Sequence, residues 1–207
     1  MSIDNKNKDL TSNLVLASAN AGKIKELQQM LGGLGFNIVP QAQLNIADIE
    51  ETGLTFVENS ILKARNAAAH SSLPAVADDS GLEVDFLKGA PGIYSARFAG
   101  DAATDASNRD KLLELMKDVP ADERTARYQT VIVYMRHSND PTPIICQGTW
   151  EGSIATDEKG DGGFGYDSIF QVAETNCRAA ELDKDTKNRL SHRGKAMAKL
   201  LSKLQLR

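Results

Sequence analysis

The chain has 207 residues, a quarter of them charged, and its 28 acidic side chains outnumber its 24 basic ones. This length fits one large domain or two closely joined lobes, and the acidic balance argues against a duplex nucleic-acid partner. No apolar run approaches the roughly twenty residues of a membrane span, and the two cysteines, Cys146 and Cys177, lack the paired spacing of a metal knuckle. We therefore expect a polar N-terminal extension over residues 1–13, a single domain over residues 14–207, and a soluble cytoplasmic protein that contacts neither membrane nor nucleic acid.

Short apolar runs alternate with helical patterns in the first half of the chain. The expected elements are a strand at 14–17, a helix from Ile24 to Leu34, a strand at 36–39, a helix opened by the capping box of Thr55 and Glu58 and reaching Ala68, and a buried strand ending at Asp78.

The second half predicts a helix at about residues 105–117, which Pro120 ends, and a hairpin with strands at 127–136 and 144–149. A final helix follows Ser191, and its apolar stripe leaves three lysines outside: Lys195, Lys199 and Lys203. Helices that alternate with strands early, followed by a hairpin, predict an α/β fold with a central mixed sheet flanked by helices.

Asp78 and Asp79 follow the apolar run Pro74–Ala77 directly. Side chains at a strand's carboxyl end lie at the edge of an α/β sheet where ligands bind, and two adjacent carboxylates repel each other unless a cation or proton relieves them. Because Ser80 and Gly81 come next, an ordinary Asx-turn explains the same residues. The pair predicts either a metal-binding position or a turn.

The segment Ser18–Lys23 joins the first strand to the first helix. A helix N-terminus offers free N–H groups and a partial positive charge, and small residues let a phosphate approach the backbone. The segment is not a Walker loop, because the earlier glycine is missing and Ile24 stands where Ser or Thr would hold magnesium. A plain N-cap made by Ser18 or Asn20 is the alternative.

Three further segments combine residue types that suit a nucleotide site, each with a simpler explanation. Glu50 and Glu51 form a second acidic pair, which is either a metal site shared with Asp79 or a solvated loop. The glycine-rich loop at residues 162–167 places two aromatic rings where one could stack on a base, or it is a turn with Phe164 in the core. The basic cluster Ser191–Gly194 is either a solvated helix face or a ligand site, because it lies at a helix N-terminus, where cations are unfavourable unless an anionic or carbonyl ligand is bound.

Together these segments resemble the inosine triphosphate pyrophosphatase family, in particular its bacterial branch, which acts on noncanonical purine nucleoside triphosphates. The resemblance covers roughly residues 14–204. It is carried by six ordered motifs: Ser18–Lys23, Glu50–Gly53, Asp78–Leu82, Gly89–Arg97, Gly163–Asp167 and Ser191–Gly194.

The resemblance implies an elongated central mixed sheet, with two lobes around an active-site cleft, in a homodimer. It implies hydrolysis of dITP, ITP or XTP to the monophosphate and pyrophosphate, with Mg²⁺ as the cofactor. Asp79 would be the general base and would bind the metal with Glu50, supported by Asp78 and Glu51. Substrate-binding residues would be Ser18, Ala19, Asn20, Ala21, Gly22, Lys23, Lys63, Ser80 and Lys187 for the triphosphate and sugar, and Phe164, Gly165, Tyr166, Asp167, His192 and Arg193 around the base.

Selectivity would follow from the purine 6 position, where hypoxanthine and xanthine carry an acceptor oxygen and adenine carries a donor. Arg193 aimed at that edge would favour the first two bases. Two departures from the family pattern affect loop geometry alone: Ser18–Ala19–Asn20 stands where Thr-Gly-Asn is common, and Ser168 stands where Pro usually follows Tyr-Asp.

Three other functions fit parts of the sequence. An aspartyl-phosphate phosphatase would need a second Asp two positions after its nucleophile, but Ser80 and Gly81 occupy those positions. A nucleotide sensor without turnover would gain little from the acidic pairs beside its anionic ligand. RNA binding through Lys184–Lys199 conflicts with the net charge.

Overall fold

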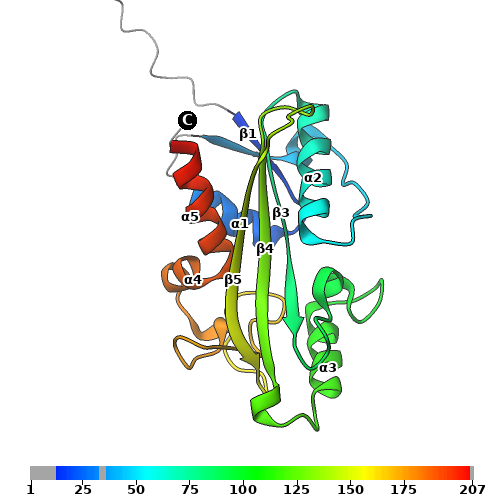
Figure 1. The fold of residues 1–207 in the computed structure, drawn as a ribbon, viewed down its shortest axis with the longest axis vertical. Coiled ribbons are helices and arrows are strands. Elements are labelled where there is room, and N and C mark those ends of the chain that lie inside the picture. Colours follow the sequence, from blue (N-terminus) through cyan, green and yellow to red (C-terminus); the bar gives the residue numbers. More distant parts are fainter. Residues whose placement is uncertain (1–12, 33–35, 206–207) are drawn as a thin grey trace, which may run out of the picture.

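The computed structural model describes residues 13–32 and 36–205 (Figure 1). Apart from Asn13, which begins the first strand, the expected polar extension at 1–13 lies outside the described residues, as does Leu34 at the expected end of the first helix.

One mixed sheet, five α-helices and several short 3₁₀ helices make up the described structure. The strands are β1 (Asn13–Ala17), β2 (Asn37–Pro40), β3 (Ala75–Val84), β4 (Thr125–Met135), β5 (Ile144–Ile154) and β6 (Phe170–Val172). The α-helices are α1 (Ala21–Leu31), α2 (Phe56–Ser71), α3 (Asp105–Leu115), α4 (Lys184–Leu190) and α5 (His192–Gln205), and a 3₁₀ segment, η3 (Gly92–Arg97), follows β3. The predicted elements are present, whereas β6 and the separate α4 were not predicted.

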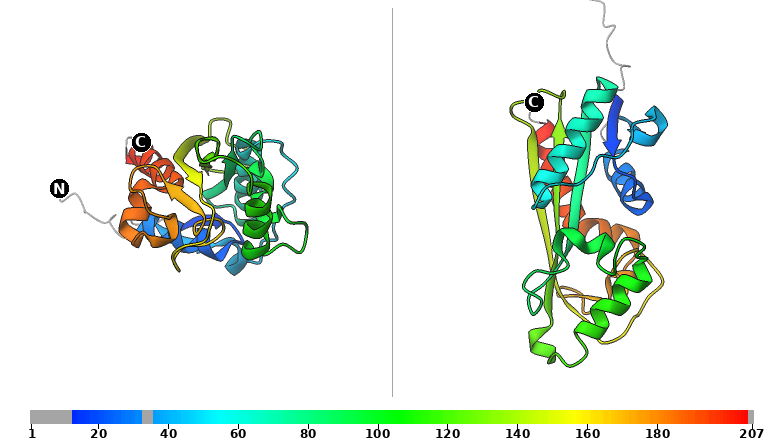
Figure 2. Two further views of the ribbon diagram at one scale, coloured as in Figure 1. Left: turned by 90° about the horizontal axis from the view of Figure 1, so that it is seen from below. Right: turned by 90° about the vertical axis from the view of Figure 1, so that its right-hand side faces the viewer.

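The strand order is β2-β1-β3-β4-β5-β6, with β1 parallel to both neighbours and the later pairs antiparallel. This confirms the predicted α/β fold. The long strands β3, β4 and β5 run the length of the molecule, and α1, α2 and α5 surround one end while α3 lies at the other (Figures 1 and 2). Separate apolar clusters fill the two ends, one around Leu82 and Trp150 and two others on either side of β1.

Strand β3 corrects one prediction, because it continues through Asp78 to Val84 instead of ending there. Its parallel partner β1 ends at the pair Ala17–Ala77, while β4 continues to pair with β3 along its whole length. Gly81 is therefore a strand residue and not a turn residue: a Cβ at this position would lie 2.2 Å from the Gly92 carbonyl oxygen of η3. Asp78 and Asp79 lie where the parallel part of the sheet stops, which leaves one side of β3 open.

The helix ends follow the local sequence. The Thr55 hydroxyl accepts a hydrogen bond from the Glu58 amide, as the capping box predicts, and Thr104 caps α3 in the same way. The apolar stripe of α5 packs Met197 and Leu200 into the core. Across the described ranges, no helix is both long and apolar enough to cross a bilayer.

Lys195, Lys199 and Lys203, which lie outside the apolar stripe of α5, cover the free edge of the sheet. Most of the outer side of β5 lacks a strand partner, because β6 pairs only with residues 152–154. Unpaired strand edges invite pairing with other chains, and lysines are a common means of blocking this. Each lysine ammonium donates to a β5 carbonyl oxygen: Lys195 to Thr149 at 3.2 Å, Lys199 to Gln147 at 2.8 Å and Lys203 to Ile145 at 3.1 Å.

Arg124 fastens the end of the molecule that contains α3. Its buried guanidinium donates to the backbone carbonyl oxygens of Met116 and Val119 after α3, and to those of Ile154 and Ala155 at the end of β5. The side chain therefore joins two segments that are far apart in the sequence, and the hydrogen bonds to Met116 and Ile154 are buried.

We predict that Arg124→Met lowers the free energy of unfolding by about 3 kcal/mol or more, because buried carbonyls lose charge-assisted hydrogen bonds. Urea denaturation followed by circular dichroism measures this. Arg127→Met is the matched control, since Arg127 makes partly exposed ion pairs with Asp85 and Glu151 and should cost less than about 1 kcal/mol. Equal losses in the two variants would contradict the structural role of Arg124.

Candidate active site

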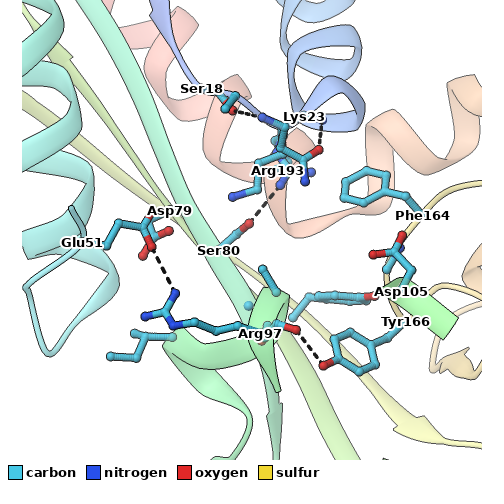
Figure 3. A pocket seen from close by; sticks show the side chains of 18 of the residues that line it. Ser18, Lys23, Glu51, Asp79, Ser80, Arg97, Asp105, Phe164, Tyr166 and Arg193 are labelled. Carbon is cyan, nitrogen blue, oxygen red and sulfur yellow. Dashed lines mark hydrogen bonds and ion pairs between the residues drawn. The ribbon is translucent and has the colours of Figure 1, made fainter. Parts of the chain in front are cut away.

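A cavity of about 560 Å³ is lined by residues from both ends of the molecule (Figure 3). Of the residues predicted to form a site, Ala21, Gly22 and Asp78 are not part of its lining. The predicted residues that line it are Ser18, Ala19, Asn20, Lys23, Glu50, Glu51, Lys63, Asp79, Ser80, Phe164, Gly165, Tyr166, Asp167, Lys187, His192 and Arg193.

Asp79 lies on β3 with one carboxylate oxygen bound to the Lys63 ammonium at 2.9 Å. The same ammonium contacts Glu51 at 2.8 Å, so one cation joins the two acidic segments. Burial raises the pKa of Asp79 above its usual value, and the charges of Lys63 and Lys23 only partly oppose this. Asp79 is therefore a stronger base than a solvated aspartate.

Donor chemistry at this end of the cavity fits a hard cation. Glu51 and Asp79 converge on one positive charge, and Glu50, which is exposed, lines the same cavity. Among residues 13–32 and 36–205, no three His, Cys, Asp or Glu side chains form a complete protein metal site. Magnesium is often held by one or two carboxylates together with substrate phosphates, so an incomplete set of this kind suits it.

Asn59 was missed by the sequence analysis. Its fully buried side chain donates to the second oxygen of Asp79 at 3.3 Å and accepts from the Gly53 amide at 2.8 Å. It thereby ties the acidic loop to β3. The available signal was its position four residues before Lys63, which puts both side chains on one face of α2.

Asp78 is not part of the cavity lining and is 1% exposed. It pairs with Lys23 at 3.4 Å and with Arg193 at 3.1 Å. Burial alone would raise the pKa of Asp78, but Lys23 and Arg193 hold it well below its usual value. The carboxylate is thus charged and joins the first and last helices to the centre of the sheet.

At the start of α1, the Asn20 side chain accepts a hydrogen bond from the Lys23 amide at 3.0 Å. The predicted N-cap is confirmed for Asn20, and phosphate binding here stays a prediction. Burial lowers the pKa of Lys23, although the nearby Asp78 opposes this.

The loop at the other end of the cavity is held by Asp167. Its carboxylate accepts hydrogen bonds from the Tyr128 hydroxyl at 3.2 Å, the Phe164 amide at 2.9 Å and the Lys187 ammonium at 2.8 Å. Burial by itself lowers the pKa of Lys187, yet Asp167 and Glu26 raise it above its usual value. Lys187 therefore lies beside the aromatic loop as a firmly charged group.

Phe164 and Tyr166 have different environments. The Tyr166 ring is buried and its hydroxyl donates to the Ser95 carbonyl oxygen at 2.8 Å. Phe164 is only half-buried and lies over Lys187 and Arg193, at 5.1 and 5.9 Å from its ring centre. The alternative in which Phe164 is a core residue is therefore wrong. Tyr166, and not Phe164, belongs to the apolar cluster around Leu82 and Trp150.

Helix α3 holds Gly165 by both of its backbone groups. The Asp105 carboxylate accepts from the Gly165 amide at 2.7 Å, and Arg109 donates to its carbonyl oxygen at 2.9 Å. Neither residue was predicted to belong to the site. Their polar pattern on α3 resembles that of any solvated helix face, so only the fold reveals this contact.

Glu26 also escaped prediction. On α1, its carboxylate bridges Lys187 at 2.9 Å and Arg193 at 2.5 Å. Four N–H groups of Arg193 bind Asp78, Glu26 and Ser80, which leaves one of its five donors for another partner.

His192 stacks on Tyr128, with ring centres 4.7 Å apart and planes 8° from parallel. Its Nδ1 has no hydrogen-bond partner in the described part of the chain. Burial, together with the charges of Arg193 and Lys187, lowers the pKa of His192 well below its usual value. The imidazole is therefore neutral.

This arrangement defines an elongated two-lobed α/β protein with a charged, partly aromatic cavity between its lobes. The chain belongs to the Ham1 family, whose model matches residues 14–203.

Named relatives and solved structures agree with this assignment. The dITP/XTP pyrophosphatase of Photobacterium profundum is 57% identical over 194 residues, which cover 94% of this chain and 98% of that protein. The HAM1 protein of Coxiella burnetii is 47% identical and superposes with a TM-score of 0.88, covering 95% of this chain and all of that one. The dITP/XTP pyrophosphatase of Mycobacterium abscessus is 38% identical with a TM-score of 0.72, covering 91% and 98%.

The buried neutral imidazole of His192 predicts a pH-dependent stability. The unfolded chain takes up a proton below pH of about 6.5 and the folded chain does not, so the free energy of unfolding falls as the pH drops below that value. The contribution is about 1.4 kcal/mol per pH unit. His192→Gln should have a shallower decline by that amount in urea titrations between about pH 5 and pH 7. Parallel curves for the two proteins would contradict the prediction.

Proposed function

We propose that the protein is a magnesium-dependent pyrophosphohydrolase that converts dITP, ITP and XTP to the monophosphate and pyrophosphate. The observation that carries this proposal is the convergence of Asp79, Lys63 and Glu51 at one end of a cavity whose other end is formed by the Phe164 loop. Phosphate chemistry and base recognition are thereby separated within one cavity. The printed names of relatives that match nearly the whole chain support the same activity.

Magnesium would be held by Asp79 and by the acidic loop, through Glu50 or Glu51, together with phosphate oxygens of the substrate. When bound, it supplies positive charge at those oxygens and lowers the pKa of a bound water. Lys63, which now neutralises both Glu51 and Asp79, would turn toward the phosphates as these carboxylates take their new partner.

Asp79 would orient a water molecule toward the α phosphorus and accept its proton. A bond forms between the water oxygen and that phosphorus, and the bond from the phosphorus to the bridging oxygen of the β phosphate breaks. Lys23 and Lys63 would then neutralise charge that collects on the leaving pyrophosphate. The raised pKa of Asp79 suits this task, because burial makes its carboxylate more basic.

The base would bind among Phe164, Asp167 and His192, with the half-buried Phe164 ring as a stacking surface. Arg193 keeps one free donor, which would face the purine 6-oxo group. An adenine amino group would instead place donor against donor.

Two further expectations complete the proposal. The resemblance to the pyrophosphatase family predicts a homodimer, which analytical ultracentrifugation would measure. A cytoplasmic location, where nucleoside triphosphates are made and used, would fit the proposed substrates.

Replacing the proposed base tests the reaction. With dITP and magnesium, Asp79→Asn should lower kcat by a factor of about 10² to 10⁴, because the amide cannot accept the proton. Binding of dITP should remain measurable by calorimetry. The readout is pyrophosphate release from dITP, XTP, dGTP and dATP.

Asp85→Asn is the matched control, since Asp85 pairs with Arg127 on the surface and does not line the cavity. It should retain full turnover. Near-normal activity in Asp79→Asn would reject the role of Asp79, and orthophosphate as the product would indicate a phosphatase.

Replacing the proposed selector tests base recognition. Arg193→Ala should reduce the ratio of kcat/KM for dITP over dATP by about tenfold or more, because one hydrogen bond to a charged donor is lost. Since this variant also removes one of the two cationic partners of Asp78 and of Glu26, the assay must be run well below its thermal midpoint. An unchanged ratio would refute this account of selectivity.

A further inference from the structure

We propose that Arg97 binds the outer phosphates of the triphosphate, the part that leaves as pyrophosphate. This inference rests on the proposed function and adds a residue to the phosphate end of the site. Arg97 belongs to a motif noted in the sequence, yet it received no role there, because an arginine after small residues looks like a surface side chain.

Arg97 is the last residue of η3, which packs against the end of β3 that follows Asp78 and Asp79. The Ser95 hydroxyl accepts a hydrogen bond from the Leu82 amide at 2.9 Å and donates to the Gly92 carbonyl at 2.6 Å. The Ser95 carbonyl oxygen in turn accepts from Tyr166. Because η3 is anchored to both the strand and the aromatic loop, the backbone of Arg97 has a defined place in the cavity wall.

The guanidinium extends toward the acidic end of the cavity and away from Phe164 (Figure 3). Its Nη1 lies 3.8 Å from Glu51, and its guanidinium carbon lies over the Tyr94 ring, 5.0 Å from the ring centre. Since Glu51 also contacts Lys63, Arg97 and Lys63 flank one carboxylate. The Glu51 carboxylate lies between two cations, Lys63 and Arg97. The space between these cations therefore suits an anion, and a phosphate group could bind to both.

Arg97 differs from the other cations of the cavity in how weakly it is paired. Lys23, Lys63, Lys187 and Arg193 each have a carboxylate oxygen within 3.4 Å. Arg97 has a longer contact, donates no hydrogen bond from its guanidinium within the described structure, and keeps 39% of its side chain exposed. Its donors are therefore free for a ligand at little cost in broken contacts.

The position identifies which phosphates Arg97 would contact. Asp79, which would direct water at the α phosphorus, shares Lys63 with Glu51, and Arg97 lies on the Glu51 side. The phosphates beyond the α position would extend there. A guanidinium offers paired N–H groups that match phosphate oxygens, so Arg97 would neutralise charge on the departing pyrophosphate without forming or breaking a bond.

The test is calorimetric titration of metal-free protein, in the presence of chelator, with inorganic tripolyphosphate and separately with dIMP. Arg97→Met should weaken tripolyphosphate binding about tenfold or more and leave dIMP binding unchanged, because dIMP has no outer phosphates. Arg97→Lys should bind with intermediate affinity, because it keeps the charge but loses the fork.

Arg65→Met is the matched control: Arg65 is exposed on α2, donates to the Ser138 carbonyl oxygen, and does not line the cavity. It should titrate like the unaltered protein. Tripolyphosphate affinity of Arg97→Met within twofold of the unaltered value, an equal loss for dIMP, or no binding of tripolyphosphate to the unaltered protein would each overturn the inference. Absence of pyrophosphate release from dITP would reject the proposed function instead, since the titrations need no turnover.

Discussion

The buried carboxylate of Asp78 is the point on which the arrangement of the molecule depends. It lies in the middle of β3 and binds Lys23 from the first helix and Arg193 from the last. An isolated charge at this depth would be very costly, so the two helices are held where they compensate it. The N-terminal ends of α1 and α5, which contribute Lys23 and Arg193, are thereby held at one carboxylate.

The charged side chains that line the cavity are also paired with one another. Lys63 pairs with both Glu51 and Asp79 at the acidic end, while Glu26 and Asp167 both pair with Lys187 at the aromatic end. A triphosphate and its metal would exchange these internal partners for new ones. Ligand binding would therefore replace one ion pair with another and would leave no buried charge unpaired.

The periodicity of apolar residues predicted five of the six described strands, the hairpin included, and four of the five described α-helices, and the motifs located most of the residues around the cavity. These local patterns failed for residues whose partners are distant in the sequence. Ser80 and Gly81 resemble a turn, and only their pairing with β4 makes them strand residues. Asn59 and Glu26 were missed because a polar residue on a helix face has the same local pattern whether it meets solvent or a carboxylate.

The row of lysines along β5 has a practical consequence. Their ammonium groups occupy carbonyls that the amides of another strand would otherwise bind. Reagents that acylate surface amines would remove the positive charges and leave one N–H donor on each side chain, which weakens the cover of the strand edge. Fluorescent labelling or surface immobilisation through amines would therefore promote self-association. Attachment through an introduced cysteine far from this edge would avoid that outcome.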